Sequence, residues 1–399
     1  MNIIHTADWH LGQTFFEYDR THEHDCFLEW LSQQIESNNV ELLLIAGDIF
    51  DSPNPSAESQ KRFYDFLCSV TKRNNNLKII ITAGNHDSGA RLEAPDPILE
   101  SLNVTVRGVV RRTNDGEIDF ERLIVPVNDR LCCLAVPYLR QGDYVASESY
   151  DKGVQSMYSE LYRRAKERFE CVIAMGHLQA TGSEISIDDR YERTTIGGLD
   201  RINPGAFDDG IAYTALGHLH KAQRVSGREN VRYSGAPLPM SFAERNNRQS
   251  VTLVKLIDGA AEIENIEFDT PVKLLSIPRE PLPIENVIEE IASLPMGAID
   301  NISPLLEIKV LITEPEPGLR NRIEEALEGH AVRLVRIEAV TRSGEDTLSA
   351  PMSYEELKKI EPAELAKSIY CQKYGTEDIP AKIKELLTDV IKEIEEEEK

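Results

Sequence analysis

The chain has 399 residues, of which 44 are Lys or Arg and 68 are Asp or Glu, so its formal net charge is −24. Its content of 41% apolar and 28% charged residues is typical of a globular protein and excludes a wholly disordered one. So acidic a chain should repel nucleic acid on average, and binding DNA would therefore require a local positive site, bound metal ions or a basic partner.

The compartment can also be predicted from the sequence. No apolar run approaches the roughly 18 residues that a membrane span requires, so we expect no membrane partner. The first residues, 1–6, contain no basic segment, and we interpret them as a first strand and not as a signal peptide. Six scattered cysteines without a CxxC pair favour a reducing, cytoplasmic compartment.

Over the first 270 residues, short apolar runs alternate with amphipathic helical stripes. The helical stripes are predicted around 28–35, 63–70 and 154–169. Strands and helices in alternation predict an α/β sheet covered on both faces. The runs of strand length, apolar on both faces, are 3–4, 42–45, 79–81, 172–175 and 212–216.

The pattern changes after residue 223. Three segments with turn residues between them predict a β meander that closes the domain. Four prolines then predict a linker over 271–283. A β-α-β unit follows, and after a loop at 341–349 a helical tail carries an apolar stripe that either packs on its own domain or binds a partner. We expect domains over 1–270, 271–345 and 346–399. The meander strands are 231–234, 250–257 and 261–268, and the later elements are helix 284–294, strand 306–312, helix 317–329 and strand 332–340.

Five short polar motifs each follow a predicted strand. Because the carboxyl ends of neighbouring parallel strands gather at one edge of a sheet, we expect all five to converge there. Their glycines allow sharp turns and close approach of the backbone to a ligand. The motifs are Asp8-Trp9-His10, Gly47-Asp48, Gly84-Asn85-His86-Asp87, Gly176-His177 and Gly217-His218-Leu219-His220.

These motifs offer seven carboxylate, imidazole and amide donors, which are too many for one metal ion and suit two. Without a cysteine donor we do not expect a structural zinc site, and manganese, iron and zinc remain open. Two ions about 3.5–4 Å apart activate a water for phosphoryl chemistry. If Asp48 bridges, one ion takes Asp8, His10, Asp48 and His220, and the other takes Asp48, Asn85, His177 and His218.

Other polar residues near the motifs have simpler interpretations. His86 is not needed as a ligand, and we expect it to contact the phosphate and protonate the leaving oxygen. Asp87 is expected to orient a neighbour. His5 lies inside the first strand and is predicted to be a core histidine. His22 and His24, near a helix start, are expected to cap or solvate that helix, with a substrate-facing role left open.

Together the motifs resemble the pattern D-x-H, G-D, G-N-H, G-H and G-H-x-H of the calcineurin-like metallophosphoesterase superfamily. Within it, segments 5–12, 46–51, 83–88, 217–220 and 232–242 resemble the SbcD family, the nuclease subunits of bacterial SbcCD complexes. The resemblance implies a two-sheet sandwich flanked by helices, followed by a small β-α-β cap domain and a helical tail. It also implies the seven metal ligands above and a catalytic His86.

The same resemblance implies an activity and partners. It implies a manganese-dependent nuclease with 3′ to 5′ exonuclease action on duplex DNA and endonuclease action on single strands and hairpins, serving DNA repair, recombination and replication. It implies a homodimer of the nuclease domain, joined by two SbcC ATPase subunits that the tail binds and that would supply much of the DNA grip. Arg20, Arg190 and Arg193, in loops 13–22 and 183–201, are candidate DNA contacts.

Two alternatives remain open from the residues. The first is a small-molecule phosphodiesterase or a protein phosphatase on the same two-metal site. Protein phosphatases typically read Gly-Asp-x-x-Asp-Arg-Gly, whereas this chain has Asp51-Ser52 at that place. The second is a scaffold with a vestigial site, which the seven intact donors argue against.

Overall fold

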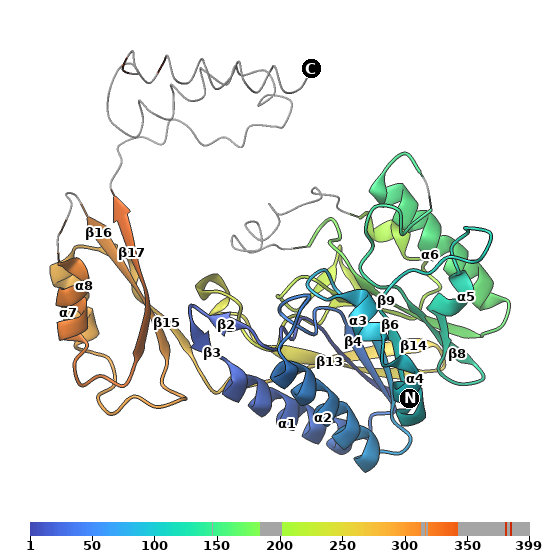
Figure 1. The fold of residues 1–399 in the computed structure, drawn as a ribbon, viewed down its shortest axis with the longest axis horizontal. Helices are drawn as coiled ribbons and strands as arrows, with labels where there is room; N and C mark the ends of the chain where they lie inside the picture. The colour runs from blue at the N-terminus through green and yellow to red at the C-terminus, as the bar shows by residue number, and fades with distance from the viewer. Residues whose placement is uncertain are drawn as a thin grey trace. The chain divides into compact units, whose positions relative to one another are not determined.

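The computed structural model describes residues 1–145, 147–183, 202–312, 316, 318–341, 380 and 384. The chain divides into two compact units, Met1–Val340 and Thr341–Lys399. The predicted helical tail lies almost wholly outside the described residues, as do Arg190 and Arg193. Figure 1 shows the described part of the chain, with α1 and α2 on one side of its sheets and α6 on the other.

The first sheet has six strands in the order β14-β13-β1-β4-β5-β6. The four strands β1, β4, β5 and β6 run parallel, and β13 pairs antiparallel with β1. The strands are β1 Asn2–Thr6, β4 Leu42–Ala46, β5 Lys78–Thr82, β6 Val104–Arg107, β13 Ser250–Ile257 and β14 Ala260–Glu267.

The second sheet also has six strands, in the order β11-β12-β10-β9-β8-β7. Its four inner strands β12, β10, β9 and β8 run parallel. The strands are β7 Ile124–Pro126, β8 Leu131–Ala135, β9 Cys171–His177, β10 Tyr213–Gly217, β11 Gln223–Val225 and β12 Arg228–Tyr233.

The two sheets pack face to face, which explains why their strands are apolar on both faces. Successive side chains of a strand point to opposite faces. Leu42 and Leu44 therefore pack between the sheets against residues such as Ile173. Leu43 and Ile45 pack instead beneath the helices. The predicted α/β fold is confirmed, and it is the two-sheet sandwich that the family resemblance implies.

Each sheet is covered on its outer face by helices. α1 Thr21–Ser37 and α2 Ala57–Arg73 bury their apolar stripes on the first sheet, and α6 Tyr150–Lys166 packs on the second. α2 begins after Ser56, whose side chain caps the Ser59 amide. The short elements are β2 Thr14–Phe15, β3 Tyr18–Asp19, α3 Gly89–Glu93, α4 Asp96–Leu99, α5 Phe120–Leu123 and the 3₁₀ turns Glu100–Leu102, Pro204–Ala206 and Phe242–Glu244.

The predicted β meander is wrong, because its strands lie in different sheets. β12 belongs to the second sheet, whereas β13 and β14 form a hairpin of the first. The connection between them, 234–249, contains Pro237 and Pro239. Proline has no amide hydrogen to donate to a ladder, so the chain leaves the second sheet here. β13 then pairs with β1, placing Leu253 opposite Ile4.

The predicted linker at 271–283 is also wrong, since most of it is a strand. β15 Leu274–Leu282 pairs parallel with β16 at the edge of a three-stranded sheet. Pro278 and Pro281 lie where the register shifts between Ile277 and Leu282, and an edge strand with such an irregularity tolerates proline. The rest of this β-α-β unit follows the prediction: α7 Ile284–Ile291, β16 Leu305–Ile312, α8 Leu319–Ala326 and β17 Arg333–Thr341.

No helix within the described ranges is both long and apolar enough to cross a membrane. The five cysteines whose side chains are described, Cys26, Cys68, Cys132, Cys133 and Cys171, form no disulfide.

His5 is a core histidine, as predicted, and this should make stability depend on pH. It is fully buried in β1, and its Nδ1 lies 2.9 Å from the Tyr213 hydroxyl. Burial lowers the pKa of His5 to about 3. An unfolded histidine has a pKa near about 6.5, so below that pH the unfolded state binds a proton that the folded state excludes. Stability should therefore fall as pH falls from 6.5 towards 3.

We expect His5 alone to lower the free energy of unfolding by about 3 kcal/mol between pH 7 and pH 4. The His5→Gln variant keeps a hydrogen-bonding group beside Tyr213 and should flatten this dependence. Urea unfolding at pH 7, 5.5 and 4 measures it. His22→Gln, on the exposed surface of α1, is the control and should leave the slope unchanged. An unchanged slope in His5→Gln would contradict the argument.

Candidate metal centre

The five motifs lie at the carboxyl ends of β1, β4, β5, β9 and β10, three in the first sheet and two in the second. Backbone contacts join them across both sheets. The Asp8 amide donates to the Gly47 carbonyl over 3.0 Å. The His218 amide donates to Asp8 Oδ1 over 2.9 Å, which links the second sheet to the first. The expected convergence therefore occurs at the common edge of the sandwich.

The donor side chains gather into two groups. Asp8, His10 and His220 place ligand atoms within 4.8 Å of one another. Asp48, His177 and His218 do the same. All but His218 are buried, with His220 the most exposed of the others at 6%. Each group contains three of the four residues of one expected ligand set.

Asp48 and Asn85 complete the arrangement. Asp48 Oδ2 lies 3.1 Å from His177 Nε2 in one group and 3.8 Å from His10 Nε2 in the other. Asn85 Oδ1 lies 3.0 Å from His177 Nε2 and 3.0 Å from His218 Nδ1. The Asp48 carboxylate thus faces an Nε2 atom of each group, as a bridging ligand would.

Four of the seven donors have a strained backbone. Asp8, His10, Asp48 and His218 have φ values of 56°, 48°, 50° and 97°. Side chains other than glycine seldom adopt this left-handed region, and such strain persists where the surrounding structure enforces it, often at functional sites. The surrounding structure therefore holds the backbone at these four positions in a conformation that it would otherwise seldom adopt.

Two glycines allow the loops to approach this closely. A Cβ at Gly47, where φ is +88°, would lie 2.2 Å from His177 Nδ1. A Cβ at Gly84 would lie 2.1 Å from Asp48 Oδ1. Any larger residue would displace a donor, so the glycines of these two motifs are required for the packing of the site and not only for its turns.

The chemistry of the donors fits divalent cations. The ring nitrogens of His10 are buried without a well-formed hydrogen bond, although Nδ1 lies 3.4 Å from Asp51 Oδ1 and Nε2 lies 3.8 Å from Asp48 Oδ2. Buried polar atoms usually have a closer partner, and a cation would provide one for Nε2. Burial alone would lower the pKa of His177, but Asp48 and Asp8 outweigh it and raise that pKa to about 9. Burial also opposes ionisation of Asp48, yet His177 and His10 lower its pKa. Burial raises the pKa of Asp8, the other buried carboxylate of the site. The Asp48 carboxylate, held ionised beside imidazoles, provides negative charge that a cation needs.

His86 lies at the edge of this site. Its Nδ1 is 3.0 Å from the Asp51 carbonyl, and its ring packs edge-on against His10 with centroids 4.8 Å apart. His10, Asp51 and His86 form a third group, whose candidate ligand atoms also lie within 4.8 Å of one another. His86 can therefore act beside the two metal ions or be a ligand of one of them. The metal content of a variant without His86 distinguishes these two roles.

The structure shows how three supporting residues hold the motif loops and one of the donors. Asp87 accepts hydrogen bonds from the amides of Gly84, Ile49 and Phe50, which ties two motif loops together, in agreement with its expected orienting role. His24 is buried and bonds the Trp9 carbonyl over 3.0 Å, so it supports the Asp8–His10 turn. Glu244, in the 3₁₀ turn after Pro239, bonds His220 and was not anticipated because no motif surrounds it.

Arg20 is not available to DNA, contrary to the expectation. Its side chain is buried, bonds both carboxylate oxygens of Glu23 and donates to the Pro239 carbonyl over 2.7 Å. Arg20 therefore holds two loops together next to the site.

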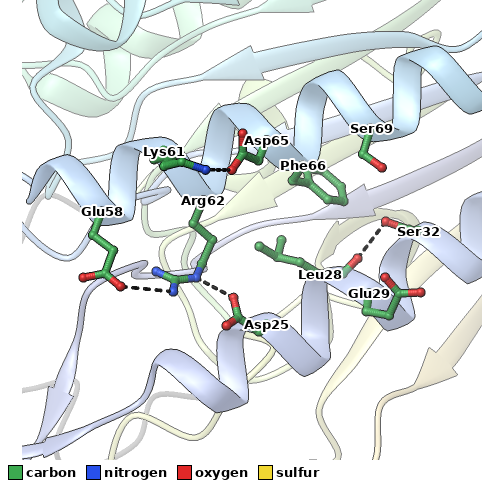
Figure 2. A pocket seen from close by; sticks show the side chains of 10 residues that line it. All are labelled: Asp25, Leu28, Glu29, Ser32, Glu58, Lys61, Arg62, Asp65, Phe66 and Ser69. Atoms are coloured by element: carbon green, nitrogen blue, oxygen red, sulfur yellow. Dashed lines mark hydrogen bonds and ion pairs between the residues drawn. The ribbon is translucent and has the colours of Figure 1, made fainter.

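A groove of about 370 Å³ lies between α1 and α2, away from the donor groups. Figure 2 shows five of its charged residues paired with each other, Arg62 with Asp25 and Glu58, and Lys61 with Asp65, whereas Glu29 pairs with none of them. None of its lining residues belongs to the metal-ligand groups, and its paired charges are typical of a solvated surface.

The chain is similar to proteins of known family over most of its length. Residues 1–222 match the model of the calcineurin-like phosphoesterase family, and residues 270–374 match a model described as the type 5 capsule protein repressor C-terminal domain. The SbcD subunit of the SbcCD nuclease of Rhodobacter capsulatus is 35% identical over 365 residues, covering 86% of this chain and 88% of the relative.

Two further relatives carry the same name. The Escherichia coli K12 protein is 33% identical, covering 67% of this chain and 68% of the relative. The Bacillus subtilis protein is 32% identical, covering 65% and 67%. With the donor groups described above, these matches show that the chain belongs to the calcineurin-like phosphoesterase family and, within it, to the SbcD subunits of SbcCD nucleases.

Proposed function

We propose that this protein is the nuclease subunit of an SbcCD complex and hydrolyses phosphodiester bonds of DNA in repair, recombination and replication. The observation that carries the proposal is the pair of imidazole and carboxylate groups that meet at Asp48. It occurs in a chain that is similar, over most of its length, to a relative named as a nuclease subunit. The alternative of a small-molecule phosphodiesterase or phosphatase is not favoured, because the named relatives are nucleases.

The residues fit two divalent ions, which we propose to be Mn²⁺. Two ions sharing a carboxylate ligand activate water as a nucleophile and stabilise negative charge on the phosphate. Nitrogen and oxygen donors suit manganese. One ion would be held by Asp8, His10, Asp48 and His220, and the other by Asp48, Asn85, His177 and His218.

His86 would contribute the proton transfer. Its Nδ1–H donates to the Asp51 carbonyl, which fixes the ring and leaves Nε2 for exchange with a substrate oxygen. The ring is half-buried, so it can reach both the site and a phosphate bound there. We propose that His86 acts with a second proton on Nε2, contacts the phosphate through that N–H and transfers this proton to the leaving oxygen.

The names of the relatives give only their membership of an SbcCD complex, and the assembly that we propose goes beyond them. A homodimer of this chain would join two SbcC subunits, with 1–270 as the nuclease domain, 271–345 as the cap domain and 346–399 as the region that binds SbcC. With a net charge of −24, the chain would rely on its two ions for local attraction of phosphate and on the partner for much of the DNA grip.

The purified chain, with and without the partner ATPase, should cleave end-labelled duplex, single-stranded and hairpin DNA when Mn²⁺ is present and not when EDTA removes it. Bis-p-nitrophenyl phosphate provides the comparison. Hydrolysis of that ester without cleavage of any DNA, even with the partner present, would support the small-molecule alternative and contradict the proposal.

Deleting residues 350–399 should abolish binding of the partner ATPase and leave Mn²⁺-dependent phosphodiester cleavage largely unchanged. The reason is that all seven proposed ligands lie within 8–220, whereas the predicted apolar stripe lies at 379–394. A pull-down and the ester assay measure the two effects. Deletion of only 395–399, which removes the terminal glutamates, is the control and should retain binding. Retained binding without 350–399 would place the partner surface elsewhere.

A further inference from the structure

A buried carboxylate lies directly behind one of the proposed ligands. Glu244 is 2% exposed, and its Oε1 lies 3.1 Å from His220 Nδ1. Its Oε2 accepts the Met240 amide over 2.9 Å. Each carboxylate oxygen therefore has its own partner, and one of those partners is an imidazole of the metal centre.

The loop that carries Glu244 is held from a second side. Arg20, itself locked by Glu23, donates to the Pro239 carbonyl over 2.7 Å. The Ala236 amide donates to the His220 carbonyl over 3.0 Å. The Arg20 contact and the Met240 amide thus hold the Glu244 carboxylate without involving the His220 ring, as required of a group that orients that ring.

This contact determines which nitrogen of His220 faces an ion. A neutral imidazole has one N–H and one free nitrogen. If Nδ1–H donates to Glu244, the unprotonated Nε2 is the atom left to act as the ligand beside Asp8 and His10. A carboxylate behind the ring also makes that nitrogen more basic. His177, by contrast, donates its Nδ1–H over 2.9 Å to a neutral partner, the Ala46 carbonyl.

We propose that Glu244 is a positioning residue that fixes the ring of His220 and strengthens binding of the ion held by Asp8, His10, Asp48 and His220. This inference rests on the proposed two-ion site. It predicts that loss of the Glu244 charge weakens the binding of one ion and leaves the affinity for the other ion unchanged.

The test is calorimetric titration of the ion-free protein with Mn²⁺, which measures affinity without turnover. In Glu244→Gln a single acceptor oxygen cannot serve both the Met240 amide and His220. One of the two ions should then bind about 10–100-fold more weakly. Glu244→Asp keeps the charge on a shorter side chain and should fall between Glu244→Gln and the wild type.

Glu93→Gln is the matched control. Glu93 is a buried carboxylate that pairs with Arg111 and Arg122, outside the metal-ligand groups. Glu93→Gln should lower the melting temperature and leave both Mn²⁺ affinities unchanged, which separates a structural role from positioning of a ligand.

The outcomes separate this inference from the proposed function. If the wild type binds two ions and Glu244→Gln binds both with wild-type affinity, the positioning role is wrong while the two-ion site stands. An equal loss of affinity for both ions in Glu244→Gln would also overturn the positioning role. If Glu244→Gln does not fold, Glu244→Asp decides, and unchanged affinities there overturn the inference. If the wild type binds fewer than two ions, the proposed site itself is wrong.

Discussion

The Asp48→Ala variant is expected to lose both manganese ions and, with them, phosphodiester hydrolysis. The Asp48 carboxylate faces His177 at 3.1 Å and His10 at 3.8 Å, so its removal takes a donor from both groups at once. It also accepts the His86 amide over 2.8 Å, so the third motif loop loses an anchor. Because the ions supply several kcal/mol of transition-state stabilisation, hydrolysis should fall at least about 10³-fold.

Emission spectroscopy on the dialysed variant measures the metal, and the ester assay measures the rate. The control is Asp65→Ala, which removes an exposed aspartate paired with Lys61 on α2. It should keep two ions and the wild-type rate. Two retained ions in Asp48→Ala would contradict the bridging role of this carboxylate.

The His86→Ala variant is expected to keep both ions and lose most hydrolysis. His86 belongs to neither of the two groups that meet at Asp48, so metal affinity should survive its removal. Loss of a positioned general acid typically costs about 10²–10⁴-fold in rate.

The measurement for His86 combines metal content with the rate at saturating Mn²⁺. His22→Ala, an exposed histidine of α1, serves as the control for removal of an imidazole. Loss of metal from His86→Ala equal to that from Asp48→Ala would show that His86 is itself a ligand, within the third group formed with His10 and Asp51.

The elements nearest the chemistry could be predicted from local patterns. The strands β1, β4, β5, β9 and β10 are short apolar runs that end in a polar motif, and such runs are recognisable without knowledge of their partners. The order and spacing of the motifs therefore predict which side chains come together at the edge of the sandwich.

What could not be predicted depends on contacts between residues far apart in the sequence. β13 pairs with β1 across about 250 positions, and no local pattern distinguishes that pairing from a meander. The burial of Arg20 could not be predicted, because it depends on its hydrogen bonds to Glu23 and to the Pro239 carbonyl, which is 219 residues away in the sequence. The proposed role of Glu244 likewise depends on its contact with His220, which precedes it by 24 residues.

The most direct test of the two-ion centre is the anomalous scattering of a crystal of this protein soaked in MnCl₂. Two peaks are predicted, about 3.5–4 Å apart. One should touch Asp8, His10 and His220, the other should touch Asn85, His177 and His218, and Asp48 should reach both. A single peak, or these side chains turned away from any peak in a folded molecule, would contradict the account.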